Sequence, residues 1–197
     1  LLICGTYTKM KNAIVLCSGG LDSIVTAHYV KKRLRYGKIR ILFFNYQQRT
    51  LNMERKYSKK CSKDIGADFI EINVKELSKL SSSLINSNKK AKKITRRKLN
   101  NTKKESDKWY VPCRNIIFIT YALALADYLN IKNKEKNNIF IGFKNEGKEP
   151  FPDATPEFVK QINKLQKTAI KRDINIIAPL IKKDKEDIIK LGDKIRV

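Results

Sequence analysis

A short loop of serine and glycine residues, flanked by a strand and a helix, constrains this chain more than any other feature. The run Ser18–Ser23 (SGGLDS) follows an apolar stretch over Ala13–Cys17 and leads into a helical pattern over Ser23–Arg35. A strand that ends in a glycine-rich turn and then enters a helix is typical of phosphate-binding sites in α/β proteins. The sequence therefore predicts such a site here, and the alternative is an ordinary glycine-rich turn.

Each residue type in this loop suits the phosphates of a nucleotide. Gly19 and Gly20 lack a Cβ atom, so the backbone can come close to a ligand. The N–H groups of the turn and of the helix start, with the hydroxyls of Ser18 and Ser23, are donors for anionic oxygens. Asp22 is an acid beside this site, as expected if Mg²⁺ bridges it to the nucleotide. The Gly-Lys-Ser/Thr ending of the Walker pattern is absent.

Strand-like and helix-like segments alternate along the rest of the chain. Strands are predicted at 13–17, 39–46, 68–74, 138–142 and 175–177, and helices at 23–35, 51–65, 115–129, 155–172 and 183–191. This alternation predicts a Rossmann-like, doubly wound α/β fold with about five parallel strands and helices on both faces. Ligands of such sheets bind beyond the carboxyl ends of the strands. We expect the segments 18–23, 46–49 and 142–153 to meet at that edge.

Composition restricts the class of protein but not its function. A length of 197 residues suggests one domain, and we find neither a run that could span a bilayer nor a signal peptide. The scattered cysteines (Cys4, Cys17, Cys61 and Cys113) argue against a disulfide framework and a complete zinc site, and indicate a reducing, cytoplasmic location. The net charge of +24 favours nucleic acid only weakly, because abundant Lys, Ile and Asn could equally reflect compositional bias in the source.

One basic segment interrupts the alternation of strands and helices. Residues 86–108 hold ten Lys or Arg and two acids, with few apolar residues, which predicts a mobile surface loop. The functional alternative is a lid over a nucleotide or an RNA-contacting arm. We expect residues 1–10 to be a short N-terminal extension, and residues 11–197 to form the single domain.

Two further groups of polar residues follow predicted strands or open predicted helices. Tyr46, Gln48 and Arg49 end the second strand and suit a nucleotide or another heterocycle, although a polar turn is an equally good reading. Arg114 and Asn115 open a long helix, where the helix dipole favours acids rather than cations. Arg114 is therefore expected to contact a phosphate or a substrate carboxylate. A structural ion pair is the alternative.

A shaped loop after the fourth strand supplies the last candidates. It begins at Gly142 and leads, through two prolines, to Asp153 just before a helix. Asp153 could accept N–H groups from a purine-like edge, or could simply cap that helix. His28, the only histidine, is expected to be packed or at the surface rather than catalytic.

Four sequence blocks, taken together and in this order, resemble the 7-cyano-7-deazaguanine synthases. They are SGGLDS, FNYQQRT, VPCRNIIF and FPDATPEF, and the similarity runs from about Lys11 to Gly192. The first block is shared by many N-type ATP pyrophosphatases, whereas the other three narrow the resemblance to this one family. Phe151 stands where the family more usually has Tyr. The resemblance implies an adenine nucleotide alpha hydrolase-like fold.

The resemblance also implies a reaction with ATP, Mg²⁺, 7-carboxy-7-deazaguanine and ammonia. ATP adenylates the carboxylate, ammonia displaces AMP to give the amide, and a second ATP converts the amide to the nitrile used in queuosine and archaeosine synthesis. The candidate catalytic residues are then Asp22, Ser23 and Arg114. ATP would be held by the Ser18–Ser23 loop with Tyr46, Gln48 and Arg49. The substrate would be held by Arg114, Asn115, Gly142 and Asp153.

The carboxyl end of the chain departs from this family. The family ends in a zinc-binding cysteine cluster, whereas this sequence stops at Val197 before any such cluster. We therefore expect no zinc in residues 1–197, and a homodimer is possible. Other readings stay open: a tRNA-thiolating or tRNA-ligating ATP pyrophosphatase, a relative that transfers a deazaguanine to a protein in a defence system, and a non-catalytic nucleotide- or RNA-binding module.

Overall fold

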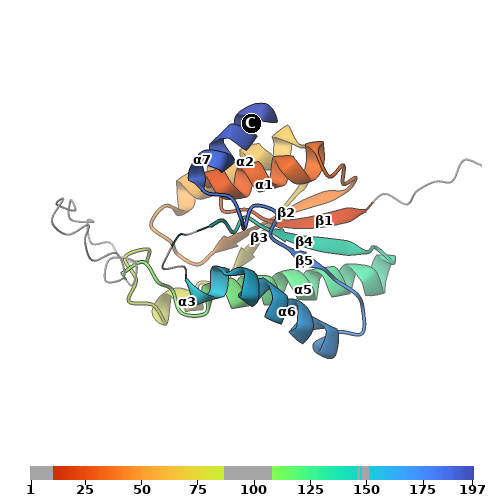
Figure 1. Ribbon diagram of the computed structural model, residues 1–197. Coiled ribbons are helices and arrows are strands. Elements are labelled where there is room, and N and C mark those ends of the chain that lie inside the picture. The colour runs from red at the N-terminus through yellow and green to blue at the C-terminus, as the bar shows by residue number, and fades with distance from the viewer. Residues whose placement is uncertain (1–10, 87–107, 146, 148–150) are drawn as a thin grey trace, which may run out of the picture.

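A sheet of five parallel strands, in the order β3-β2-β1-β4-β5, forms the centre of the protein (Figure 1). The computed structural model describes residues 11–86, 108–145, 147 and 151–197. The strands are β1 (Asn12–Leu16), β2 (Ile39–Asn45), β3 (Asp68–Asn73), β4 (Asn137–Ile141) and β5 (Ile176–Ile177). The predicted five-stranded α/β fold is confirmed.

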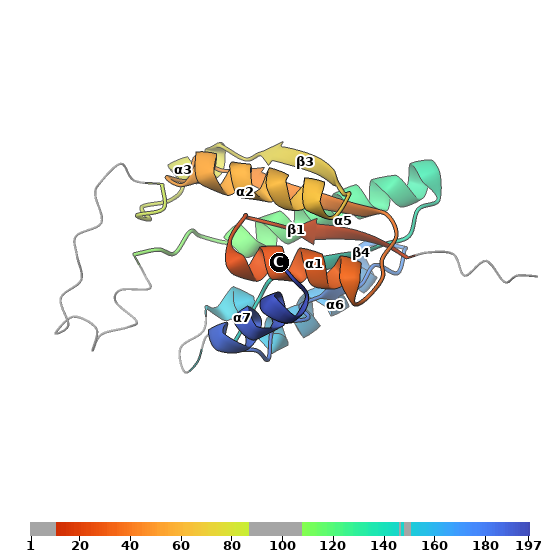
Figure 2. The ribbon, with the colours of Figure 1, turned by 90° about the horizontal axis from the view of Figure 1, so that it is seen from above.

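Helices cover both faces of this sheet, as Figures 1 and 2 show. One face carries α1 (Leu21–Lys32), α2 (Leu51–Asp64) and α7 (Lys185–Lys194). The other carries α3 (Glu76–Lys79), α5 (Arg114–Asn133) and α6 (Pro156–Ala169). The strand order reverses between β1 and β4, which makes the carboxyl ends of these two strands the switch point where ligands of such sheets bind.

Burial explains why these sequences form strands. All seven residues of β2 are buried, as expected for a parallel strand covered on both faces. In β1 the side chains alternate: Ala13 and Val15 belong to the core beneath α1 and α2, whereas Ile14 belongs to the core beneath α5. The sheet thus separates two apolar layers and holds its carboxyl edge in a fixed place.

The observed elements differ from the predicted ones mainly at their ends. Helix α1 begins at Leu21, so that Asp22 and Ser23 lie in its first turn, and α5 continues to Asn133. The four-residue α3 and a 3₁₀ turn over Pro152–Ala154 were not predicted, because such short elements carry no periodic pattern. The extension over 1–10 and most of the basic segment lie outside the described residues. Within the described ranges, no helix is both long and apolar enough to cross a membrane.

Candidate functional site

The loop after β1 leaves the first turn of α1 open to a ligand. Gly20 is the N-cap residue of α1, in an extended conformation, and no side chain caps the helix there. The first N–H groups of a helix have no partner within the helix, and such groups commonly bind anions. Ser23 Oγ donates to the carbonyl oxygen of Gly20 (2.8 Å) and lies 3.4 Å from Ser18 Oγ. The hydroxyls of Ser18 and Ser23 therefore lie close together at the N-terminus of α1.

Two glycines bring neighbouring segments against this loop. Gly19 has a φ of +78°, and a Cβ atom on it would lie 2.4 Å from the backbone oxygen of Glu54 in α2. A Cβ atom on Gly142, which follows β4, would lie 3.0 Å from backbone atoms of Asp22 and Ser23. The loop is thus clamped between α2 and the end of β4. Both glycines have a packing role, beside any role in approaching a ligand.

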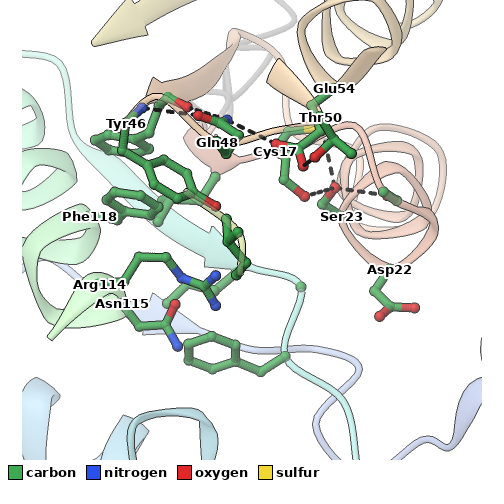
Figure 3. Close-up of a pocket in the computed structure, with 18 of the residues that line it drawn as sticks. Cys17, Asp22, Ser23, Tyr46, Gln48, Thr50, Glu54, Arg114, Asn115 and Phe118 are labelled. Carbon is green, nitrogen blue, oxygen red and sulfur yellow. Dashed lines mark hydrogen bonds between the residues drawn. The ribbon is translucent and has the colours of Figure 1, made fainter. Parts of the chain in front are cut away.

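A cavity of about 510 Å³, called here the main cavity, opens at this edge of the sheet (Figure 3). Its charged lining consists of Asp22, Arg49, Glu54, Arg114 and Lys185, and its other lining residues include Ser18, Gly20, Ser23, Tyr46, Gln48, Trp109, Asn115, Phe118 and Gly142. The predicted segments around the first loop, the end of β2, the start of α5 and the end of β4 are therefore brought together. Gly19 is not a lining residue, but its close contact with α2 holds the loop in place.

The turn after β2 is built around the buried side chain of Gln48. Its Oε1 accepts from the backbone N–H of Tyr46 (3.0 Å), and its Nε2 donates to the oxygen of Phe44 (3.0 Å) and to Glu54 Oε2 (2.9 Å). The Gln48 amide thus forms its hydrogen bonds with neighbouring protein groups. Gln48 therefore shapes the wall of the main cavity, whereas Arg49, whose guanidinium lies 5.4 Å from the centre of the Trp109 ring, presents a cation there.

Arg114 enters the main cavity from the first turn of α5 (Figure 3). The preceding residue, Cys113, has a left-handed backbone with a φ of 54°, which turns the chain sharply into the helix. Within the described ranges, no acidic side chain pairs with Arg114. Arg114 faces the hydroxyl of Tyr46, whose pKa is raised by burial against the opposing effect of this guanidinium.

A second cavity, of about 400 Å³, contains Asp153. It is lined by Tyr110, Cys113, Ile116, Phe151, Pro152, Asp153 and Phe158. The rings of Tyr110 and Phe151 stack with their centres 6.2 Å apart. Helix α6 is capped by Thr155, whose Oγ1 accepts from the N–H of Phe158 (3.1 Å), so the alternative that Asp153 is the cap is wrong. Asp153 thus lines a cavity with aromatic walls and does not cap α6.

The two cavities adjoin at the start of α5. Asn115 lines the main cavity, and its Nδ2 donates to the backbone oxygen of Asp153 in the second (3.3 Å). The rings of Phe143 and Phe158, which line one cavity each, lie 6.4 Å apart. The linings of the two cavities are therefore in contact beside Arg114, at the start of α5.

Cys17 is buried and also lines the main cavity. Its Sγ lies 3.6 Å from Ser23 Oγ, directly behind the loop. The pKa of the Cys17 thiol is lowered, chiefly by a hydrogen bond from Cys61, with smaller contributions from Ser23, Gly19 and Ser58 that act against the effect of burial. The thiol is therefore more acidic than an ordinary buried cysteine.

The residues around the main cavity suit Mg²⁺ bound together with a nucleotide. Magnesium is usually held by one or two carboxylates plus phosphate oxygens and water, rather than by a cage of protein ligands. Asp22 and Glu54 are the two carboxylates that line the cavity. The described ranges contain no group of three or more His, Cys, Asp or Glu residues that could bind a metal ion without other ligands.

Three residues that line the main cavity were not predicted from the sequence: Glu54, Trp109 and Lys185. Glu54 and Lys185 lie on charged helices, where single polar residues give no signal of their own. Trp109 follows a basic segment that was read as one surface loop. Only the fold brings these three positions to the same edge.

Comparison with known proteins places this geometry in a family context. A family model described as "Queuosine biosynthesis protein QueC" matches residues 12–197. The chain is 34% identical over 187 residues to a 7-cyano-7-deazaguanine synthase of Pyrococcus horikoshii, covering 92% of this chain and 75% of that protein. It is also 34% identical over 187 residues to a synthase of the same name from Methanococcus maripaludis, covering 94% of this chain and 77% of that protein.

Two solved structures share the fold at low sequence identity. The U34-tRNA thiolase NcsA of Methanococcus maripaludis superposes with a TM-score of 0.50 at 15% identity, over 95% of this chain and 57% of the thiolase. A 4-thiouridine synthetase, solved with RNA and bound ATP, superposes with a TM-score of 0.54 at 16% identity, over 94% of this chain and 40% of the synthetase. At such identities the likeness shows the fold alone.

Proposed function

The chain belongs to the QueC family of queuosine biosynthesis proteins, and on that premise we propose that it is an ATP-dependent 7-cyano-7-deazaguanine synthase. Its substrates are 7-carboxy-7-deazaguanine, ammonia and two molecules of ATP. The observation that carries the proposal is the junction of the two cavities at Arg114 and Asn115. One cavity has the donors for phosphates, and the other has aromatic walls and a carboxylate for a flat base.

In this arrangement the main cavity holds ATP. The open first turn of α1 and the hydroxyls of Ser18 and Ser23 receive the β- and γ-phosphates, which leave as pyrophosphate. Asp22 and Glu54 would hold Mg²⁺, which supplies charge neutralisation on the phosphates when bound. Tyr46 and Arg49 line the same cavity and contact the nucleotide. The domain that performs this chemistry extends over residues 11–197.

The deazaguanine base occupies the second cavity. Asp153 accepts hydrogen bonds from the N–H groups of the guanine-like edge, while Tyr110 and Phe151 cover the faces of the ring. This pose directs the 7-carboxylate toward Arg114 and Asn115, beside the α-phosphate of ATP. The close approach at Gly142 keeps the loop after β4 against the start of α1, so the two substrates remain in contact.

The chemistry then follows from position and charge. A carboxylate oxygen attacks the α-phosphorus and pyrophosphate leaves; the nitrogen of ammonia then attacks the carbonyl carbon and AMP leaves, giving the amide. The amide oxygen then attacks the α-phosphorus of a second ATP and pyrophosphate leaves. The adenylated imidate loses AMP from its carbon and a proton from its nitrogen, which gives the nitrile. Arg114 first attracts the carboxylate and then stabilises negative charge on the phosphates.

The test measures AMP and the nitrile by mass spectrometry in the presence of Mg²⁺, ammonium and 7-carboxy-7-deazaguanine. We expect AMP only with this substrate, at two AMP for each nitrile. ADP in place of AMP would contradict the proposal. AMP formation that responds to tRNA and not to the deazaguanine would indicate the tRNA-modifying alternative instead.

The variant Asp153→Asn tests the base-binding role directly. Loss of a charged acceptor weakens hydrogen bonding by about 2–3 kcal/mol, so we expect KM for the deazaguanine to rise about 30- to 150-fold. The KM for ATP stays unchanged, because Asp153 lines only the second cavity. Asp173→Asn, at an exposed acid that lines neither cavity, is the matched control.

A further inference from the structure

Lys185 is a cation of the main cavity that none of the sequence motifs contains. It is the first residue of α7, and it lines the main cavity together with the loop after β1. Asp184 caps the helix before it, with Oδ1 accepting from the N–H of Asp187 (2.8 Å). The cap fixes the start of α7 and therefore the position of the Lys185 backbone.

Helix α7 is held firmly beside the phosphate loop through its packing on α1. Val25 of α1 forms a buried cluster with Leu180, Ile188 and Ile195, and a Cβ atom on Gly192 would lie only 3.3 Å from Val25 Cγ2. Figure 2 shows α7 lying along α1. These apolar contacts fix α7 against α1.

Hydrogen bonds tie the segment around α7 at both ends. Lys32, in the last turn of α1, donates to the backbone oxygens of Ile195 (2.8 Å) and Arg196 (2.9 Å). At the other end the N–H of Asn145 donates to the oxygen of Lys183 (2.8 Å). The start of α7 is therefore fixed to the loop after β4, which itself packs against the first turn of α1 at Gly142.

The charge of Lys185 is not used within the described part of the protein. No acidic side chain there pairs with it, whereas Lys190 of the same helix pairs with Glu186 at 2.7 Å. The first turn of a helix disfavours a cation by a few tenths of a kcal/mol to about 1 kcal/mol. Arg114 occupies the same kind of position, at the first turn of α5, and it too points into the main cavity.

We propose that Lys185 binds the β- and γ-phosphates of ATP and the pyrophosphate that leaves. This inference rests on the proposed ATP-dependent reaction and adds a specific contact to it. Lys185 and Arg114 come from helices on opposite faces of the sheet, so they approach the phosphates from two sides. A lysine ammonium suits this task because it is a compact charge with three donors on a flexible stem.

Binding of inorganic pyrophosphate and of AMP, each measured by calorimetry with Mg²⁺, tests the assignment without the deazaguanine. For Lys185→Gln we expect the affinity for pyrophosphate to fall about 10- to 100-fold, as for a lost charged hydrogen bond. The affinity for AMP should stay within about twofold of wild type, because Lys185 does not touch that half of ATP. Lys185→Arg keeps the charge and should recover most of the pyrophosphate affinity.

The matched control is Lys182→Gln, an exposed lysine shortly before α7 that lines neither cavity. It should bind both ligands as wild type does. Pyrophosphate binding by Lys185→Gln equal to that of wild type would overturn the assignment. Equal losses for pyrophosphate and AMP would overturn it as well, since they would mean that Lys185 maintains the shape of the cavity. A wild-type protein that binds neither ligand would refute the proposed ATP site, and with it this inference.

Discussion

The glycines Gly19, Gly20 and Gly66 allow two effects to be measured separately in the loop over residues 18–23: the cost of a left-handed backbone and the cost of a close packing contact. Gly19 combines a left-handed backbone, φ +78°, with a Cβ position only 2.4 Å from a backbone oxygen of α2. Gly66 has a similar φ, +62°, but nothing lies within 4 Å of its Cβ position. Gly20 has an ordinary φ of −80°, and its nearest neighbour there is Ser18 Oγ at 3.5 Å.

Substitution of each glycine by alanine therefore isolates one effect at a time. A left-handed alanine costs about 1–2 kcal/mol, which is the whole penalty expected for Gly66→Ala. Gly19→Ala adds overpacking against helix backbone, about 1–3 kcal/mol more, so its loss in the free energy of unfolding should be about 2–5 kcal/mol. Gly20→Ala has neither penalty and should stay within about 1 kcal/mol of wild type. The lower entropy of the unfolded chain offsets each loss by about 0.4–1 kcal/mol, and does so alike in all three variants.

Urea unfolding followed by circular dichroism measures these differences, and the midpoint temperature should fall by about 2–4 °C for each kcal/mol in a protein of this size. Pyrophosphate affinity provides a second readout, since Gly19→Ala must move the loop away from α2 whereas Gly66→Ala leaves the loop alone. Equal destabilisation of Gly19→Ala and Gly66→Ala would refute the reasoning, because the contact with Glu54 would then contribute nothing.

Three other predictions concern buried polar groups. Gln166 is buried, and among the described residues its side-chain amide has no hydrogen-bond partner. Gln166→Met should therefore raise the free energy of unfolding by about 1–2 kcal/mol, as measured by thermal unfolding. The control Gln161→Met, at an exposed residue of the same helix, should leave the free energy of unfolding unchanged. Burial, helped by Lys32, lowers the pKa of His28, so as the pH falls the His28 of the unfolded chain is protonated before that of the folded protein. The free energy of unfolding should therefore fall as the pH drops below 6.5. His28→Asn should reduce this pH dependence, and a pH dependence identical to that of wild type would count against the idea. Cys17 lines the main cavity whereas Cys61 does not, so iodoacetamide should alkylate Cys17 before Cys61, and ATP should protect Cys17. Peptide mass spectrometry can follow both thiols, and preferential labelling of Cys61 would contradict this.

Much of the fold and part of the candidate site could be predicted because the signals are local. The apolar run of β1, the two glycines and the helix after them lie within about twenty residues, and the structure keeps that order. The alternation of elements implies parallel strands, and parallel strands place their carboxyl ends at one edge. Arg114 could be singled out because a cation at the start of a helix is locally unfavourable and therefore conspicuous.

The missed features depend on contacts between distant segments. The packing role of Gly19 was not predicted, because its Cβ position is closed by α2, which lies more than thirty residues further along the chain. The second cavity, which Asp153 lines, was not predicted either, because its walls come from segments on either side of α5 and β4. Lys185 is one of many lysines in a strongly basic chain, and only the packing of α7 on α1 distinguishes it.

The distribution of the main cavity along the chain has a consequence for protein synthesis. Its walls come from the loop after β1, from the middle helices and from Lys185, and β1 itself lies between β2 and β4. A growing chain has made the phosphate loop long before β4 closes the other side of β1, and Lys185 appears later still. During translation the main cavity is therefore complete only after α7 has left the ribosome, so a bound nucleotide can give its full stabilisation only at the end of synthesis.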